Sequence, residues 1–169
     1  MKRLLLVILI GVLLAVLFRR YCFEVVYIAS PSMESAYSVK DELIINKLAY
    51  LFKDPERGDI VLLYSPLCSK DMVKRIVGLP GEELSIKEKQ VYIDGKPLEE
   101  KYADYVRSDE ILVGDNIDVF IIPKNHYFVM GDNRDVSRDS RDWLEEKGLQ
   151  KESISISCIK GKAFTLIKR

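Results

Sequence analysis

The chain has 169 residues, of which 48% are hydrophobic and 31% are charged. This length accommodates one membrane segment and one compact domain with a core, but no second large domain. Lys and Arg number 26, and Asp and Glu also number 26, so the formal net charge is zero. A balanced charge provides no overall attraction to nucleic acid, and we expect no nucleic-acid partner.

The cysteines and the histidine argue against a metal site. Cys22, Cys68 and Cys158 lie far apart and form no CxxC pair of the kind found in zinc ribbons and thioredoxin-like sites. His126 is the single histidine, so an HExxH zinc motif is impossible. We expect no metal and no cofactor. Cys158 alternates with two isoleucines in 153–158, which predicts a small core residue on a strand.

The N-terminal segment has the composition of a membrane helix. An apolar run extends from Leu4 to Phe18 between basic pairs at 2–3 and 19–20. The run is shorter than the roughly 20 residues of a typical spanning helix, and its length also fits the core of a cleavable signal. No small-residue cleavage site follows it, which favours an uncleaved anchor over residues 1–22, with arginines that can snorkel. Basic residues flank both ends, so charge alone does not set the orientation.

The rest of the chain, 23–169, has the pattern of a β domain. Short apolar or alternating runs recur with turn residues between them, which predicts antiparallel sheets or a barrel. These runs are Glu42–Leu48, Asp59–Tyr64, Met72–Val77, Gln90–Ile93, Asp118–Ile122, Tyr127–Met130 and Ser153–Ile159.

Local signals add one hairpin and two short helices. The pair Asp94-Gly95 lies between strand-like arms, and both residue types tolerate positive φ, so a hairpin is expected there. Helices are expected over Asn46–Lys53 and 142–147, the second ending at Gly148. The charged stretch 98–110 lacks a pattern, and we expect a solvated loop.

Four separated segments have compositions that packing alone does not explain. They are the stretches Ser30-Pro31-Ser32-Met33-Glu34, Arg57-Gly58-Asp59-Ile60-Val61, Val73-Lys74-Arg75-Ile76-Val77-Gly78-Leu79-Pro80-Gly81, and the run from Gly131 to Arg141 that reads GDNRDVSRDSR.

Lys74 is a candidate for a buried amine. On a strand, Met72, Lys74 and Ile76 share one face, so the amine has apolar neighbours on both sides. Desolvation disfavours an ammonium, and such burial lowers the pKa of a lysine from about 10.4 toward neutrality. Arg75 faces the other way and can pair with a carboxylate, for which Asp139 is the expected partner.

Ser32 is the candidate nucleophile. A serine hydroxyl needs a neighbouring base, and a neutral lysine amine can serve as one. By itself Ser32 is an ordinary turn residue. The chain offers no suitable histidine as that base, and what favours Ser32 over an ordinary turn serine is its place among the four segments above.

The four segments resemble, in order and spacing, the conserved boxes of the bacterial type I signal peptidases. The resemblance extends from the apolar helix to Gly161-Lys162-Ala163, and the string GDNRDVSRDSR is its most specific part. It implies a fold of coiled antiparallel β-sheets, shared with self-cleaving SOS repressors, behind one N-terminal transmembrane helix. It also implies that any inserted subdomain is small, a hairpin region near 82–125.

The resemblance implies roles for individual residues. Ser32 would attack the scissile carbonyl and Lys74 would be the general base. Ser137 would hydrogen-bond to the Lys74 amine and orient it. Ser30 would complete an oxyanion hole with the Ser32 backbone N–H. The structural supports would be Asp139 and Arg141, which would pair with Arg75 or with each other, and Asp132, Asn133 and Arg134, which would fix the final turn.

Three positions depart from the usual family pattern. Pro31 precedes the nucleophile, where a small residue is common, and it restricts φ and removes an N–H. Ser35-Ala36 replaces a usual Pro-Thr, and Val136 replaces a common asparagine. These changes remove no catalytic group, but the first two affect the geometry toward substrate.

The function implied is that of a membrane-bound serine endopeptidase (a hydrolase of the signal peptidase I type) on the outer, extracytoplasmic face of the cell membrane. Its partners would be signal-peptide-bearing preproteins, cut after small residues, and the lipid bilayer, with Phe23, Val25, Val26, Tyr27 and Ile28 close to lipid. Two alternatives keep the Ser/Lys pair: a relative that matures one exported substrate, and a membrane-tethered regulator that cleaves itself. A binding protein without catalysis is the remaining alternative.

Overall fold

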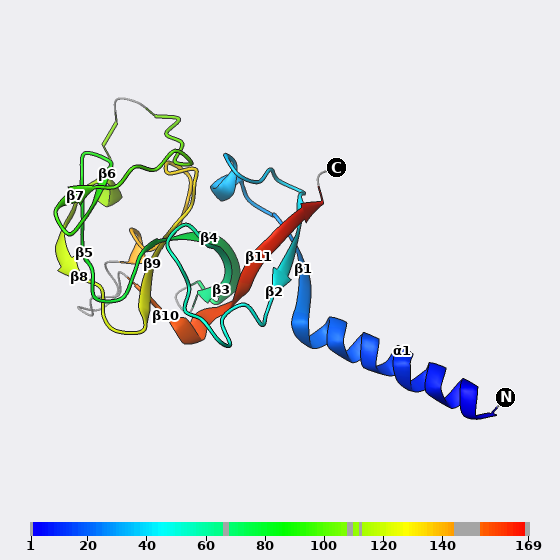
Figure 1. The fold of residues 1–169 in the computed structure, drawn as a ribbon. Coiled ribbons are helices and arrows are strands. Elements are labelled where there is room, and N and C mark those ends of the chain that lie inside the picture. The colour runs from blue at the N-terminus through cyan, green and yellow to red at the C-terminus, as the bar shows by residue number, and fades with distance from the viewer. Residues whose placement is uncertain (1, 66–67, 108–109, 112, 144–152, 168–169) are drawn as a thin grey trace.

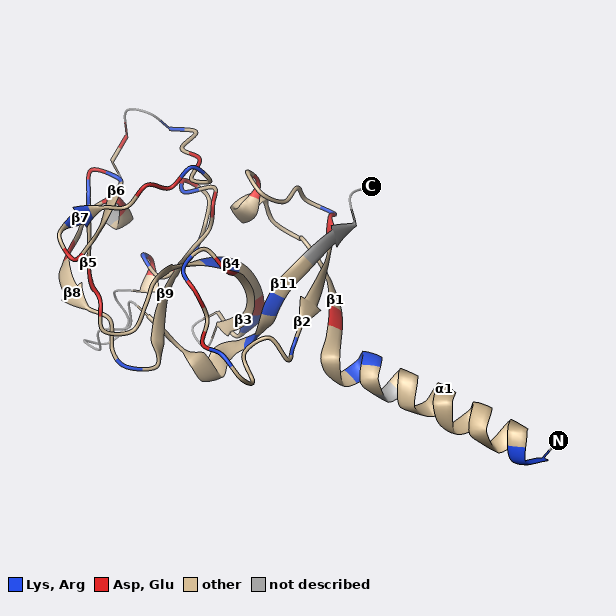
Figure 2. Ribbon diagram, in the orientation of Figure 1, with Lys and Arg blue, Asp and Glu red and all other residues tan. Residues whose placement is uncertain are grey.

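The fold is described from a computed structural model, which places residues 2–65, 68–107, 110–111, 113–143 and 153–167. One helix, α1 (Lys2–Cys22), projects from a body built of two β-sheets (Figure 1). By length and composition α1 is able to span a membrane. Its basic residues lie near its two ends, as Figure 2 shows, and its final turn carries Arg19 and Arg20. The predicted combination of antiparallel sheets and one N-terminal helix is confirmed.

The larger sheet has seven strands in the order β1-β2-β11-β3-β4-β9-β10. All its neighbouring strands are antiparallel. The strands are β1 (Phe23–Tyr27), β2 (Glu42–Asn46), β3 (Ile60–Ser65), β4 (Lys70–Gly78), β9 (His126–Met130), β10 (Ile154–Ser155) and β11 (Ile159–Ile167).

The smaller sheet has four strands in the order β7-β6-β5-β8. They are β5 (Glu83–Lys87), β6 (Gln90–Ile93), β7 (Lys96–Pro97) and β8 (Ile117–Ile121). Short 3-10 helices occur at Pro31–Met33 (η1), Val113–Asp115 (η2) and Ile156–Cys158 (η4). The hairpin expected at Asp94-Gly95 is confirmed: the two residues have φ angles of 49° and 72°, and Ile93 pairs with Lys96.

The runs predicted to start at 42, 59, 72, 90, 118 and 127 are strands whose ends differ from the prediction by at most two residues. The run 153–159 is not one strand. The Ser155 hydroxyl accepts a hydrogen bond from the Ser157 backbone N–H and caps η4, so the chain turns before β11 begins. Cys158 therefore lies in η4, partly buried at the edge of a core cluster rather than inside a strand.

The helix expected over Asn46–Lys53 is also wrong. The Asn46 side chain accepts the Leu48 N–H and starts a turn, and Leu51 and Phe52 are 61% and 97% exposed. A short helix without a buried apolar face is not stable. In the second predicted helix, 142–147, only residues 142–143 belong to the described part of the chain.

Sequence patterns did not reveal β1 or β5. β1 pairs with β2 along its whole length, so its side chains alternate between two faces. Val26 and Ile28 pack into a core cluster with Leu43, Ile45 and Leu62, whereas Val25 and Tyr27 are exposed. Of the five residues expected near lipid, Val26 and Ile28 therefore point into the protein.

Candidate active site

The predicted nucleophile lies in a tight turn just after β1. Ser32 is in the middle of η1 and is 8% exposed, and Met33 beside it is 1% exposed and anchors the turn in the body. Pro31 occupies the first position of η1, where the restricted φ of proline fits and its missing N–H costs nothing. The turn thus accommodates the unusual proline without distortion.

Lys74 is at the centre of β4 and is 2% exposed, as the alternation of apolar residues predicted. Its Nζ lies 2.8 Å from Ser32 Oγ and donates a hydrogen bond to it. Burial lowers the pKa of Lys74 from 10.5 to about 8, and attraction to the Asp139 carboxylate partly opposes the shift. The structure therefore brings together two groups that are 42 residues apart in sequence, and the amine loses its proton at a lower pH than an exposed lysine does.

The other two predicted serines adjoin this pair. Ser30 Oγ is 3.2 Å from Ser32 Oγ. Ser137 is buried and faces Gly131 and the Asp139 carboxylate. The expected hydrogen bond from Ser137 to Lys74 is absent, because the Ser137 hydroxyl forms no hydrogen bond of ordinary geometry with any residue that the structure describes.

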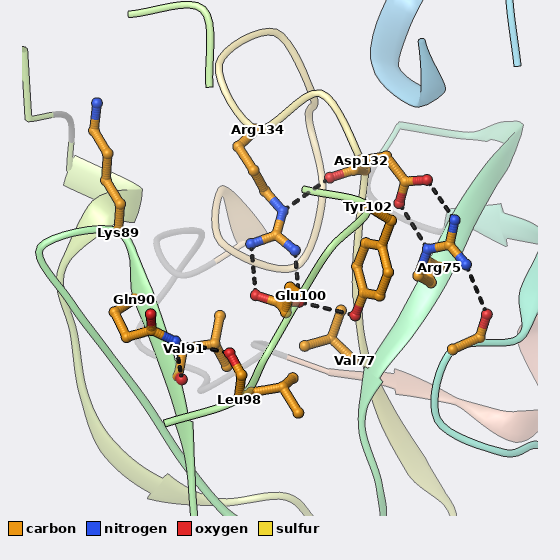
Figure 3. Close-up of polar contacts among 12 residues, drawn as sticks. Arg75, Val77, Lys89, Gln90, Val91, Leu98, Glu100, Tyr102, Asp132 and Arg134 are labelled. Carbon is orange, nitrogen blue, oxygen red and sulfur yellow. Dashed lines mark hydrogen bonds and ion pairs between the residues drawn. The ribbon is translucent and has the colours of Figure 1, made fainter. Parts of the chain in front are cut away.

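The expected ion pair between Arg75 and Asp139 is wrong. β4 pairs with β9 at Arg75 and Met130, which places Asp132, two residues past Met130, in front of the guanidinium. Arg75 binds Asp132 through two hydrogen bonds of 2.8 and 2.5 Å and also donates to the Gly58 carbonyl, at 2.9 Å (Figure 3).

Asp139 pairs instead with Arg141, through Nε at 2.9 Å, and accepts the Gly131 N–H. Burial raises the pKa of Asp139, but the adjacent Arg141 charge and these hydrogen bonds outweigh it, so the pKa of this carboxyl is lowered overall. Asp139 therefore remains ionised beside the Lys74 amine. Its charge is the larger of two, ahead of Asp132, that favour the ammonium form of Lys74 and raise its pKa against the effect of burial.

The turn formed by residues 131–135 is hydrogen-bonded to the backbone of the nucleophile. The Asn133 backbone N–H donates to the Ser32 carbonyl at 3.1 Å. Arg134 is buried and binds both oxygens of Glu100, at 2.6 and 3.0 Å (Figure 3). Sequence reasoning missed Glu100, which lies in the stretch expected to be a solvated loop. That stretch has no periodicity, and the buried arginine that needs its charge is 34 residues away.

A groove of about 320 Å³ leads to Ser32 and Lys74. Its walls are the end of β1 with the residues that follow it, 26–30, and the first half of β4, 70–74, with Met33 and Leu62 also lining it. β1 is the edge strand of its sheet, and β9 pairs with β4 only from Arg75 onward. In the described ranges, no group of three or more His, Cys, Asp or Glu side chains is placed to hold a metal ion.

The fold and the site together describe a β protein in which a buried lysine amine contacts a serine hydroxyl, as a lysine-activated serine hydrolase requires. A family model described as signal peptidase, peptidase S26, matches residues 1–167. The chain therefore belongs to the signal peptidase family, peptidase S26.

Individual relatives agree with this assignment. A probable signal peptidase I-2 of Synechocystis sp. is 39% identical over 140 residues, which cover 79% of this chain and 61% of the relative. Signal peptidase I V of Bacillus subtilis is 33% identical over 83% of this chain and 89% of its own length. The crystal structure of a signal peptidase I from Enterococcus faecalis superimposes with a TM-score of 0.50 at 28% identity, covering 67% of this chain and 98% of that one.

Proposed function

We propose that this chain is a membrane-bound serine endopeptidase that removes N-terminal signal peptides from exported preproteins after small residues. Ser32 is the nucleophile and Lys74 the general base. The observation that carries the proposal is the 2.8 Å contact between Lys74 Nζ and Ser32 Oγ, made by an amine that is 2% exposed. Membership of the signal peptidase family supports the same reaction and substrate class.

The reaction begins with proton transfer from the Ser32 hydroxyl to the neutral Lys74 amine. Ser32 Oγ attacks the scissile carbonyl, and the oxyanion accepts hydrogen bonds from the Ser32 N–H and the Ser30 hydroxyl. Lys74 then gives its proton to the leaving amine, which leaves an acyl-enzyme on Ser32. Finally Lys74 takes a proton from a water molecule, which hydrolyses the ester.

Supporting roles are assigned to the rest of the predicted site. Ser137 is placed behind Gly131, and we assign it to orienting the Lys74 amine during turnover. Asp139 and Arg141 hold the same region through their ion pair. Arg75 and Asp132 hold β4 against the end of β9.

The groove fits an extended peptide. The edge of β1 and the edge of the first half of β4 that β9 leaves unpaired among the described residues both offer backbone groups, so a substrate segment can bind between them as an added strand. Met33 and Leu62 make the floor apolar. A shallow apolar floor beside the nucleophile favours small side chains next to the scissile bond.

We assign residues 1–22 to a membrane anchor and residues 23–169 to the catalytic domain on the outer face, with 82–125 as a small inserted region. β1 follows α1 directly and its exposed residues Val25 and Tyr27 lie near the helix end. The groove is therefore close to the membrane surface, where a precursor is still held by its apolar signal segment.

The test is cleavage of a signal-bearing precursor by the purified full chain in detergent across pH. Because only the neutral amine accepts a proton, kcat/KM should fall about tenfold per pH unit below a midpoint near 8, the pKa to which burial lowers Lys74. Ser32→Ala and Lys74→Ala should each lower kcat by at least about 1000-fold. Cleavage retained by either variant would refute the assignment of the pair.

A further inference from the structure

Residues 99–107, here termed the strap, lie across the turn 131–135 that supports the nucleophile. The Asp104 N–H donates to the Asp132 carbonyl at 2.8 Å, and the Arg134 N–H donates to the Asp104 carbonyl at 2.9 Å. Asp104 and Asn133 thereby form a parallel β-bridge. The strap is thus attached through backbone bonds to the segment whose Asn133 N–H binds the Ser32 carbonyl.

Tyr102 connects the two buried ion pairs of this region. Its ring lies against the Arg75 guanidinium, with 4.1 Å between Arg75 Cζ and the ring centroid. Its hydroxyl donates to Glu100 Oε1 at 3.0 Å, and Glu100 in turn binds Arg134. Figure 3 shows Tyr102 between the Arg75–Asp132 pair and the Glu100–Arg134 pair. Arg75 is the residue next to Lys74 on β4, so the strap contacts the strand that carries the amine.

The strap also reaches the loop that carries the nucleophile. Ser35 Oγ donates a hydrogen bond of 2.5 Å to the Tyr102 carbonyl, 67 residues away in sequence. Ser35 is exposed and is three residues after Ser32. The nucleophile loop is therefore held at two points, by Asn133 at Ser32 and by the strap at Ser35.

We propose that the strap sets the position of Ser32 relative to the Lys74 amine, with Ser35 and Tyr102 as positioning residues. The argument rests on the proposed function of Ser32 and Lys74. Neither positioning residue contacts the reacting atoms: Ser35 acts on the loop through the Tyr102 carbonyl, and Tyr102 acts on β4 through Arg75. The step most sensitive to a small displacement is the attack by Ser32. Substitution of either positioning residue should therefore lower kcat and leave KM nearly unchanged.

The experiment measures kcat, KM and thermal unfolding of the full chain in detergent for Ser35→Ala and Ser38→Ala. Ser38 lies in the same loop, is exposed, and its hydroxyl forms no hydrogen bond with the described residues, so it is the matched control. We expect Ser35→Ala to lower kcat about 3- to 10-fold, the effect of one lost hydrogen bond, with KM within about twofold. Ser38→Ala should match the parent, and Ser35→Ala should lower the unfolding temperature by no more than a few degrees, so that kcat is measured on folded enzyme.

A second pair of variants tests the other end of the strap. Tyr102→Phe keeps the ring on Arg75 and should keep kcat within about threefold of the parent, whereas Tyr102→Leu should lower kcat about 10-fold or more per folded enzyme. The pH midpoint should stay near 8 in both, because the burial of Lys74 is unchanged.

The outcomes separate this proposal from the one on which it rests. If the parent cleaves the precursor and Ser32→Ala does not, the proposed function stands. The strap proposal is then overturned if Ser35→Ala has the kcat of Ser38→Ala, or if Tyr102→Leu lowers only the unfolding temperature. If the parent cleaves no precursor, or Ser32→Ala still cleaves it, both proposals are refuted.

Discussion

The two parts of the β body bury different kinds of side chain. Around the four-stranded sheet the core is apolar and includes Val77, Leu84, Ile86, Val91, Ile117, Ile122, Phe128 and Met130. Around Ser32, buried polar or charged groups gather beside the apolar Met33 and Leu62: Lys74, Asp132, Asn133, Arg134, Ser137, Asp139 and Arg141. Burying apolar area stabilises the fold, whereas burying charges costs desolvation that their partners only partly offset.

The difference indicates a division of tasks between the two parts. The apolar part stabilises the fold, and a loss of side-chain volume there should lower the free energy of unfolding. The charged part lowers the stability of the fold, because it keeps the Lys74 amine out of water beside the Ser32 hydroxyl. Mutations in the first should therefore act on the free energy of unfolding, and mutations in the second should act on kcat.

The largest effect is expected from Lys74→Met, which keeps the volume and removes the amine. Activity should fall by at least about 1000-fold. At pH 7 the free energy of unfolding should rise by on the order of 2 kcal/mol, because burial lowers the pKa of Lys74 from 10.5 to about 8 and that penalty disappears.

The pH dependence checks the sign of this effect. Between pH 8 and 10.5 the unfolded chain holds a proton that folded Lys74 has lost, so the stability of the parent rises with pH over this window. The advantage of Lys74→Met, measured by urea unfolding, should therefore shrink toward pH 10.5. Lys87→Met, at an exposed position of β5, is the control. If Lys74→Met were less stable than the parent at pH 7, the claim that burial of the Lys74 ammonium lowers stability would be wrong.

The counterpart in the apolar part is Leu84→Ala. Leu84 is fully buried on β5, and its truncation should lower the free energy of unfolding by about 2–5 kcal/mol. The kcat per folded enzyme should not change. Val119→Ala on β8, where the side chain is 55% exposed, should cost less than about 0.5 kcal/mol. A loss of kcat in Leu84→Ala would show that the two parts are coupled.

The same substitution at two glycines compares the parts directly. A Cβ at Gly131 would lie 2.5 Å from the Ser32 carbonyl oxygen and 2.2 Å from Ser137 Oγ, so Gly131→Ala should lower kcat about 10- to 100-fold by displacing the nucleophile loop. A Cβ at Gly78 would meet the ends of the Ile122 and Leu84 side chains, at 2.3 and 2.9 Å. Gly78→Ala should lower stability by about 1–3 kcal/mol and leave kcat unchanged. Equal kcat values for Gly131→Ala and Gly78→Ala would show that the two parts of the β body do not differ in their effect on catalysis.

A small effect is also expected for an exposed lysine of the seven-stranded sheet. Lys160 pairs with Asp71 at 2.7 Å, and both side chains are 41% exposed. Lys160→Met should change the free energy of unfolding by less than about 1 kcal/mol, and less still at high salt. Comparison with Lys74→Met then isolates burial as the cause of the larger change.

Local sequence patterns predicted much of the secondary structure of this protein. The proximity of Lys74 to Ser32 was expected only from the resemblance to signal peptidases, but alternating apolar residues predicted most strands of the seven-stranded sheet and the burial of Lys74, and Asp94-Gly95 predicted a hairpin. These features depend on the φ angles and side-chain directions of neighbouring residues, which the sequence encodes directly.

Tertiary structure alone decided which charges pair. Arg75 binds Asp132 rather than Asp139 because the register of β4 and β9 places Asp132 in front of it. The Glu100 side chain is buried and Tyr102 is half-buried because the strap crosses the turn at Arg134. A long charged side chain has many partners within reach in the unfolded chain. Only the order and register of the strands bring one of them close, so no local pattern could identify it.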